Sequence, residues 1–170
     1  TIFNDQIIQI TWKVGKILVY NLKLELLSDF IFETTTGEGW GITHNNKELI
    51  VSDGSCFLHF WDPKTMKQNK RIKVTYQNKK INCLNELEFY QDKNNKEYVL
   101  ANIWQTNNIA VIDLNTGIVK KMLDFSHLSK LCKNINKDVL NGIAYDKKKD
   151  VFYITGKKWD KIFCVQLKSL

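Results

Sequence analysis

Short hydrophobic runs bounded by polar clusters dominate this chain, and they predict β-strands. Each run is rich in Ile, Val, Phe, Tyr and Trp and is flanked by Gly, Asn, Asp or Lys, which is typical of strands rather than helices. The eight clearest runs are 6–12, 16–22, 49–52, 56–61, 98–104, 109–114, 151–155 and 161–167. Helical periodicity is weak, and only 126–133 (SHLSKLCK) predicts a short helix, which Ser126 would cap. The pattern therefore predicts an all-β protein.

The same strand positions recur at matched intervals, which indicates internal repetition. The ends of one class of strand fall at Trp12, Asp53, Trp104 and Lys157. Nine residues later, polar positions of the following strand fall at Asn21, Asp62, Asp113 and Gln166. Both series advance by 41, 51 and 53 residues. Repeats of about 40–55 residues with about four short strands each are typical of propeller blades. We therefore predict a β-propeller rather than a β-sandwich with accidental spacing.

A third marker opens the later repeats and divides the chain into units. It reads GEGWGI at 37–42, LNELEF at 84–89 and LNGIAY at 140–145. These markers place an incomplete blade, holding only later strands, at 1–36 and further blades at 37–83, 84–139 and 140–170. About three and a half blades do not close a ring, and an open array leaves strand edges and apolar faces uncovered. We therefore expect a further segment or a second chain to complete the propeller.

Composition and charge narrow the functional classes. Hydrophobic residues make up 44% of the 170 residues and charged residues 25%, as in folded proteins. The net charge of +7 comes from 25 basic residues, of which only Arg71 is arginine, and the lysines are scattered. Nucleic-acid binding is therefore not expected, because it usually combines arginines, basic stripes and stacking aromatics. No apolar run approaches the roughly 20 residues that span a membrane, and residues 1–20 show no signal-peptide pattern.

The four cysteines do not indicate a metal or redox site. Cys56, Cys83, Cys132 and Cys164 form no C-x-x-C pair. Cys56 lies three residues from His59 in a predicted strand, where their side chains point to opposite faces. Two disulfides would allow three pairings, and the sequence selects none of them. No metal site and no cofactor are predicted.

Eight motifs occur in order along the chain. They are GEGWGIT (37–43), LIVSDGS (49–55), FWDPKT (60–65), LNELE (84–88), ANIWQTN (101–107), IAVIDLNTG (109–117), DVLNGIAYD (138–146) and ITGKKWDKIF (154–163). Together they resemble the plant and bacterial type of glutaminyl-peptide cyclotransferases, and the resemblance extends over essentially all of residues 1–170. It implies a five-bladed β-propeller, of which this chain would be the C-terminal two-thirds.

The resemblance also implies an activity. Members of the family convert the N-terminal glutamine of peptides into pyroglutamate and release ammonia, an intramolecular acyl transfer without a catalytic metal. They often act in secretory, vacuolar or extracellular compartments. The family's N-terminal blade, with FTQG-like and YESTG-like stretches and the glutamate taken as proton shuttle, is absent from this chain. Glu38, Glu86 and Glu88 lie inside matched motifs, and Glu38 in GEGWG is the best remaining candidate for that carboxylate. The alternative is a non-catalytic propeller that binds peptides or proteins.

Five residues match the family's site residues. Trp12, Trp40 and Trp104 match tryptophans of the substrate pocket, where rigid rings would hold the folded glutamine side chain close to its own amine. Asn85 and Lys157 match catalytic polar residues, whose amide and ammonium groups would donate hydrogen bonds to the oxyanion. From the residues alone, a tryptophan in a blade strand is more often a packing residue, and an asparagine before a strand is usually a turn residue. A single lysine among 24 is usually a solvated surface residue.

Overall fold

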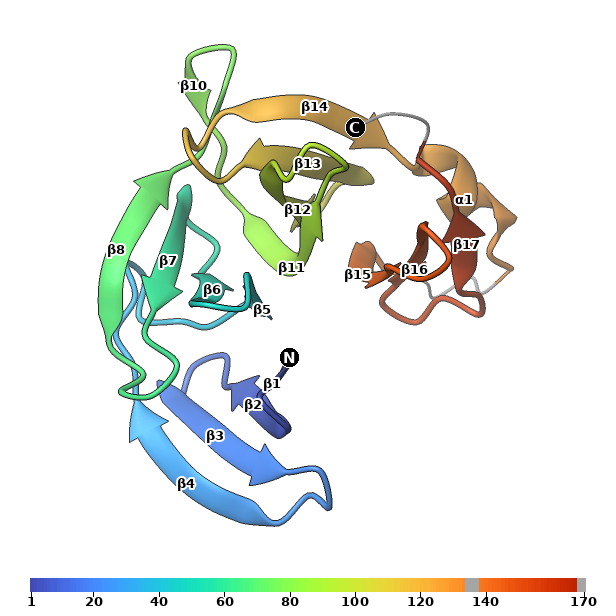
Figure 1. Cartoon of the computed structure of the whole chain (residues 1–170). Coiled ribbons are helices and arrows are strands. Elements are labelled where there is room, and N and C mark those ends of the chain that lie inside the picture. Colours follow the sequence, from blue (N-terminus) through green and yellow to red (C-terminus); the bar gives the residue numbers. More distant parts are fainter. Residues whose placement is uncertain (134–137, 168–170) are drawn as a thin grey trace.

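The computed structural model describes residues 1–133 and 138–167, and nearly all of its regular structure is β-sheet. Three four-stranded sheets and one three-stranded sheet stand around a common centre, in a propeller-like arrangement of four blades (Figure 1). Neighbouring strands within each sheet are antiparallel and follow one another in the sequence. The first strand of each sheet lies toward the centre and the last lies on the outside (Figure 1).

The strands are distributed over the sheets as follows. The first sheet contains β1 (Ile2–Phe3), β2 (Gln6–Ile10), β3 (Lys16–Asn21) and β4 (Leu26–Ile31), and the second contains β5 (Gly41–His44), β6 (Leu49–Ser52), β7 (Phe57–Trp61) and β8 (Gln68–Lys73). The third contains β11 (Leu84–Gln91), β12 (Glu97–Ile103), β13 (Asn108–Asp113) and β14 (Val119–Asp124), and the fourth contains β15 (Leu140–Asp146), β16 (Val151–Gly156) and β17 (Phe163–Val165). A small hairpin of β9 (Thr75–Tyr76) and β10 (Lys79–Lys80) and one helix, α1 (Ser126–Leu131), complete the described part.

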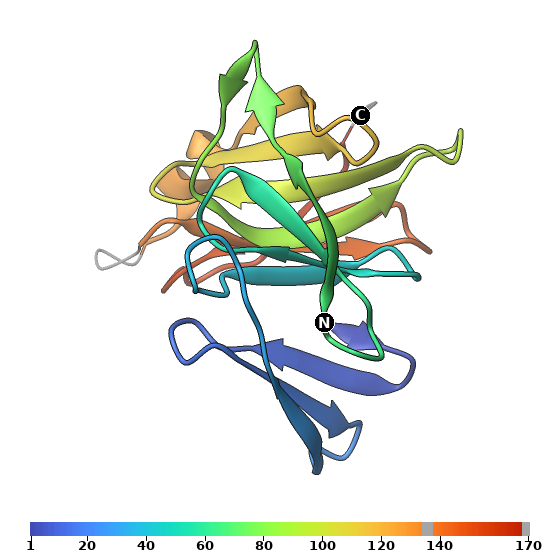
Figure 2. The same cartoon turned by 90° about the vertical axis from the view of Figure 1, so that its left-hand side faces the viewer.

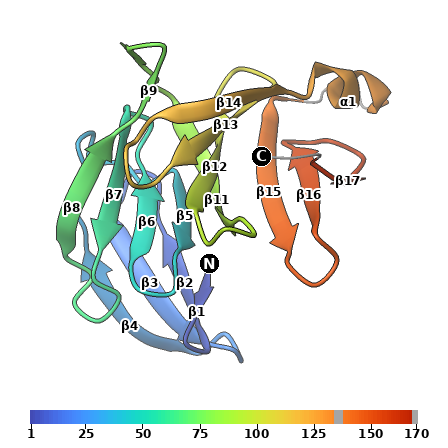
Figure 3. The same cartoon turned by 45° about the horizontal axis from the view of Figure 1, so that its top comes forward.

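The four sheets form an open arc. The first sheet, in blue, and the fourth sheet, in red, stand at its two ends (Figure 3). The hairpin of β9 and β10 projects beyond the third sheet, as the side view shows (Figure 2). In the described residues, no helix is long and apolar enough to cross a membrane. Within the same residues, no disulfide joins the four cysteines.

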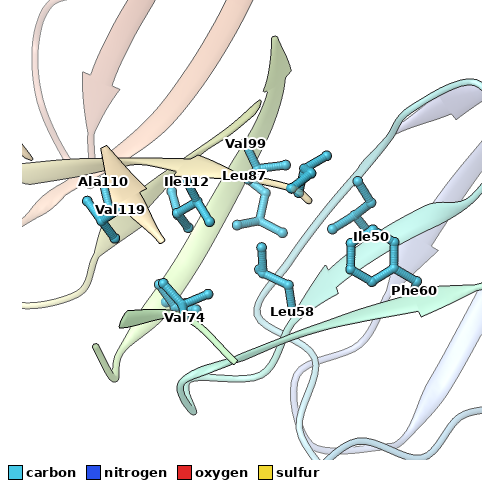
Figure 4. Close-up of a cluster of buried hydrophobic side chains, with 12 residues drawn as sticks. Ile50, Leu58, Phe60, Val74, Leu87, Val99, Ala110, Ile112 and Val119 are labelled. Atoms are coloured by element: carbon cyan, nitrogen blue, oxygen red, sulfur yellow. The ribbon is translucent and has the colours of Figure 1, made fainter. Parts of the chain in front are cut away.

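Apolar side chains between neighbouring sheets hold the blades together. The cluster between the second and third sheets includes Leu58, Phe60, Leu87, Val99 and Ile112 (Figure 4). Corresponding clusters lie between the first and second sheets and between the third and fourth. Complete burial of one such side chain contributes roughly 1.5–3 kcal/mol to stability. Each blade is therefore stabilised mainly by the blades next to it.

The eight predicted strands are present, with bounds that differ by a few residues, and the all-β prediction is confirmed. The strands that the hydrophobic pattern missed include the outermost strand of each four-stranded sheet: β4, β8 and β14. β8 reads QNKRIK, and five of its six residues are exposed, so no apolar run marks it. It is a strand because its main chain pairs with β7.

Two details differ from the sequence-based expectations. Residues 1–36 contain more than the later strands of a blade, because the short β1 pairs with β2 and makes this sheet four-stranded. The prediction that Ser126 caps the helix is wrong: Phe125 is the N-cap residue, and no side chain caps the helix. The hydroxyl and N–H of Ser126 instead both donate hydrogen bonds to Oδ1 of Asp124.

Candidate active site

One pocket collects residues from all four sheets. It has a volume of about 300 Å³ and is lined by Trp12, Gly39, Trp40, Asn85, Trp104, Asn141 and Lys157. The five residues that match the family's site therefore come together, although they are spread over positions 12 to 157 of the chain. The volume lies at the lower end of the range for ligand pockets, which suits one small group rather than an extended chain.

The repeat explains why these residues meet. Trp12, Trp104 and Lys157 follow the second strand of their sheets, which are β2, β12 and β16. Asn85 and Asn141 are the second residues of the innermost strands β11 and β15. Because adjacent strands are antiparallel, the end of a second strand and the start of a first strand lie at the same end of a blade. Equivalent positions of different blades thus converge at one end of the array.

The two innermost strands that carry asparagines share an irregularity at those residues. The pairing of β11 with β12 is interrupted within 84–87, and the pairing of β15 with β16 is interrupted within 140–143. Asn85 and Asn141 lie inside these interruptions. Such bulges release a residue from the regular ladder and redirect its side chain, and they are frequent beside active sites. The same local device therefore serves both asparagines.

Three indole rings form the apolar walls of the pocket. Trp40 and Trp104 meet edge to face, with ring centroids 5.3 Å apart and planes at 83°. Trp40 also lies against Gly54, whose φ is +80° and where a Cβ would come within 2.7 Å of the indole. This position therefore requires glycine. Trp12 is 59% exposed, and the Lys13 ammonium lies 4.3 Å from its ring centroid, so Trp12 forms the outer wall.

One carboxylate joins two of these tryptophans. Oε2 of Glu38 accepts a hydrogen bond of 2.7 Å from Nε1 of Trp40 and one of 2.8 Å from Nε1 of Trp12. The hydrogen bonds from Trp40 and then Trp12 lower the pKa of Glu38, because they stabilise the ionised form. This geometry favours a positioning role for Glu38, which holds the two indoles together, over the predicted role as proton carrier.

The two polar residues implied by the resemblance differ in exposure. Asn85 is buried, at 7% exposure, and its main-chain oxygen accepts a hydrogen bond from Oγ of Ser52 in the second sheet. Lys157 is exposed, and its backbone N–H donates to the carbonyl of Val139 at 3.0 Å. A buried amide beside an exposed ammonium provides donors of two kinds at the edge of an apolar slot.

Two residues that line the pocket, Gly39 and Asn141, were not predicted from the sequence, and Asn141 is the polar one. It follows Leu140 in the marker LNGIAY, just as Asn85 follows Leu84 in LNELEF. This shared pair of letters was the available signal. The carboxamide oxygen of Asn141 is buried and has no hydrogen-bond partner among the described residues. The pocket therefore contains an acceptor as well as donors.

The buried side chains of Asp53 and His59 lie side by side behind the wall of the pocket. Oδ2 of Asp53 lies 3.2 Å from Nε2 of His59 and accepts a hydrogen bond of 3.0 Å from the backbone N–H of Thr36. Burial would raise the pKa of Asp53, but hydrogen bonds from His59 and Ser55 lower it to about 2. Asp53 is therefore ionised and anchors the loop that contains Gly54. Its repeat position, equivalent to that of Trp12, was the signal that could have marked it.

Two further carboxylates connect the third and fourth sheets. Oε2 of Glu86 accepts a hydrogen bond of 2.8 Å from the N–H of Ile143, and Oε1 of Glu88 accepts one of 2.8 Å from the N–H of Tyr145. Burial, with the neighbouring Glu88, raises the pKa of Glu86 to about 8. Burial likewise raises the pKa of Glu88 to about 7. Both carboxyl groups therefore lose their protons at a higher pH in the folded chain than in the unfolded chain.

Glu86→Gln should reduce the loss of stability on raising the pH. The pKa of Glu86 is raised on folding from 4.5 to about 8. Its contribution is therefore complete below the unfolded pKa and is lost as the pH rises through about 8. The parent should lose on the order of 3 kcal/mol of unfolding free energy between pH 5 and pH 8.5 through this group. Denaturant titrations at both pH values measure the loss.

The variant Glu33→Gln, at an exposed carboxylate, is the matched control and should keep the parental pH dependence. An unchanged pH dependence of stability in Glu86→Gln would show that Glu86 is ionised in the folded chain at neutral pH.

In the described part of the chain, no group of three or more His, Cys, Asp and Glu side chains is placed to hold a metal ion.

Comparison with known proteins gives three consistent matches. A family model described as glutamine cyclotransferase matches residues 1–167. A curated protein of Arabidopsis thaliana, glutaminyl-peptide cyclotransferase, is 35% identical over 175 residues, covering 99% of this chain and 52% of its own length. The crystal structure of Myxococcus xanthus glutaminyl cyclase superposes with a TM-score of 0.83 at 28% identity, covering 95% of this chain and 68% of that one. The chain thus spans about half the length of the curated relative it matches.

Proposed function

The chain belongs to the glutamine cyclotransferase family, and on this basis we propose that it carries the active-site pocket of a glutaminyl-peptide cyclotransferase. The substrate is a peptide or protein with an N-terminal glutamine. Its α-amine attacks the side-chain carboxamide carbon, the new C–N bond closes the lactam ring, and the C–N bond to the side-chain nitrogen breaks. One proton moves from the attacking amine to the departing nitrogen, so the products are pyroglutamyl peptide and ammonia.

The observation that carries this proposal is the convergence of Trp12, Trp40, Trp104, Asn85 and Lys157 on one small pocket. Three rigid rings suit a slot that folds the glutamine side chain back onto its own amine, which lowers the entropic barrier to ring closure. An apolar environment also favours the neutral, nucleophilic form of the amine. Asn85 and Lys157 are the donors that stabilise the negative charge developing on the carbonyl oxygen.

The proposal is tested by incubating the full-length protein with a glutaminyl dipeptide. Release of ammonia together with formation of the pyroglutamyl product is the expected result. Binding of the dipeptide without ammonia release would favour the alternative, a non-catalytic propeller that binds peptides. This alternative is kept because none of the described residues that line the pocket has a carboxylate side chain, which the reaction needs as a proton carrier.

We further propose that an additional blade closes the ring to five and brings the proton-shuttle carboxylate. The face of the first sheet that turns away from the second sheet carries exposed apolar side chains: Ile31 is 81% exposed and Ile2 59% exposed. Strand pairing places Ile7 and Tyr20 on the same face as Ile2. A face of this kind suits another sheet packed against it.

By family resemblance, we propose that the protein acts in a secretory, vacuolar or extracellular compartment.

Glu38→Gln should retain cyclase activity within about threefold of the parent, because the glutamine oxygen still accepts hydrogen bonds from the indoles. If Glu38 were the proton shuttle, the same change would lower turnover by about 10²–10⁴. Steady-state ammonia release measures the difference. Glu38→Leu is the companion variant: it removes the acceptor that joins Trp12 and Trp40, so we expect a raised KM.

The cyclase activity should resist chelators. Among the described residues, no cluster of ligands suited to a metal ion is present, and a catalytic zinc needs about three protein ligands. Turnover is measured after dialysis against a strong chelator and again after addition of zinc. Loss of turnover followed by zinc-dependent recovery would contradict the prediction, whereas a lower melting temperature with unchanged turnover would indicate a structural ion.

A further inference from the structure

The buried carboxamide oxygen of Asn141 has no hydrogen-bond donor among the residues that the structure describes. Asn141 lines the pocket, and its Oδ1 accepts no hydrogen bond within the described residues. Roughly nine in ten or more buried polar groups in folded proteins have a partner, and each exception needs an explanation. A buried acceptor at the wall of a ligand pocket is explained by a donor on the ligand.

The backbone that carries Asn141 is held firmly by the neighbouring sheet. The N–H of Gly142 donates a hydrogen bond of 3.0 Å to Oδ1 of the fully buried Asn102, and the N–H of Ile143 donates one of 2.8 Å to Glu86. Gly142 has a φ of +145°, and a Cβ there would come within 2.8 Å of the Thr155 side chain. Two side chains of the third sheet and one obligatory glycine thus fix this bulge, which is the preorganisation that a recognition residue requires.

Charge decides which group of the substrate approaches Asn141. Leu140 pairs with Gly156, and the N–H of Lys157 donates to the carbonyl of Val139, so Asn141 and Lys157 lie on adjacent segments of the same pocket. The positive charge of Lys157 repels a second cation nearby. The substrate's α-ammonium is therefore not the group that approaches Asn141. The side-chain carboxamide is neutral, and it offers an oxygen to donors and an NH₂ group to an acceptor.

We propose that Asn141 is a specificity-determining residue, whose Oδ1 accepts a hydrogen bond from the NH₂ group of the substrate's side-chain carboxamide. This inference rests on the proposed cyclotransferase function and adds the residue that recognises glutamine. Asn85 and Lys157 donate hydrogen bonds to the carbonyl oxygen of the same carboxamide. An ionised glutamate side chain has no donor for Oδ1 and is rejected, because a site built for a hydrogen-bond donor discriminates strongly against a ligand that lacks it.

Two unreactive ligands test this assignment in the full-length protein. The first is 4-carbamoylbutanoyl-alanine amide, which has the side-chain carboxamide of glutamine but no α-amine. Without the amine, no nucleophile is available to attack the carboxamide and close the ring. The second is 5-oxohexanoyl-alanine amide, which keeps the same chain and carbonyl group but has a methyl group in place of the NH₂ group. Calorimetry measures both affinities in the parent, in Asn141→Leu and in Asn141→Asp, while ammonia release from glutaminyl-alanine amide tests the cyclotransferase function separately.

Asn141→Leu should weaken binding of the carbamoyl ligand about tenfold or more and leave the affinity for the 5-oxohexanoyl ligand within about twofold of the parent. Asn141→Asp keeps an acceptor and should bind the carbamoyl ligand within about threefold of the parent. Equal losses of both ligands, or no loss of either, would overturn the assignment. The two proposals can fail separately. If Asn141→Leu shows the selective loss of affinity but the parent releases no ammonia, the cyclotransferase function is refuted while carboxamide recognition by Asn141 is supported.

Discussion

Asn85→Ala should lower the turnover of an N-terminal glutaminyl peptide by about 10²–10³ and leave KM within about threefold. The amide of Asn85 is buried at the pocket, where a donor aimed at a developing oxyanion acts far more strongly than it does in water. The substrate carbonyl carries little charge before the reaction, so the interaction strengthens mainly in the transition state. Steady-state ammonia release over a range of peptide concentrations separates kcat from KM.

The matched control is Asn94→Ala, because Asn94 is exposed in the turn between β11 and β12, away from the pocket. It should leave both constants unchanged. Melting curves of both variants are needed, since Asn85 lies in a bulge that contributes to the packing of the third sheet. If the folded Asn85→Ala protein keeps a turnover close to that of the parent, Asn85 does not stabilise the oxyanion and has only a structural role in that bulge.

A polypeptide limited to residues 1–170 should show no cyclase activity. Among the described residues, none of those that line the pocket is a carboxylate. Proton transfer by a positioned side chain contributes a factor of about 10²–10⁴ to the rate. The face around Ile31 and Ile2, with its exposed apolar side chains, also leaves the first sheet, which carries Trp12, without support on one side. The additional blade proposed above would supply both missing parts, because it would cover this face and bring a carboxylate to the pocket.

The test expresses residues 1–170 alone, verifies folding by circular dichroism and assays ammonia release. The assay is then repeated with the remaining segment of the propeller added as a separate polypeptide. Blades associate through apolar faces and strand edges, so activity should return in proportion to the complex formed. Full activity of residues 1–170 alone would identify a carboxylate within this chain, with Glu38 as the first to examine, as the proton shuttle.

Much of the site followed from the repeated strand pattern. The spacing of Trp12, Asp53, Trp104 and Lys157 already indicated equivalent strand ends, and the structure places three of the four at the pocket. The reason is geometric: in a radial array of similar antiparallel sheets, equivalent positions necessarily lie at the same end. The family motifs then distinguished Asn85 from the other asparagines of the chain, which spacing alone did not.

Other features depend on contacts between segments far apart in the sequence, and no local pattern encodes them. β8 has a polar sequence and is a strand only because β7 offers it a partner. Glu38 became a link between two indoles because the end of β2 and the loop before β5 meet in space. Asp53 and His59 form a buried pair because β6 and β7 lie side by side.

The amino-acid sequence thus determined the kind of unit, its repetition and the end of the array at which the pocket lies, because strand propensity and spacing are local properties. Only the folded chain showed that the buried oxygen of Asn141 has no partner among the described residues, and that Glu86 and Glu88 accept hydrogen bonds from the main chain of the neighbouring sheet. It also showed that the first sheet has exposed apolar side chains on one face. Burial and hydrogen-bond satisfaction are properties of the whole assembly of sheets, and they arise only when residues distant in the chain come into contact.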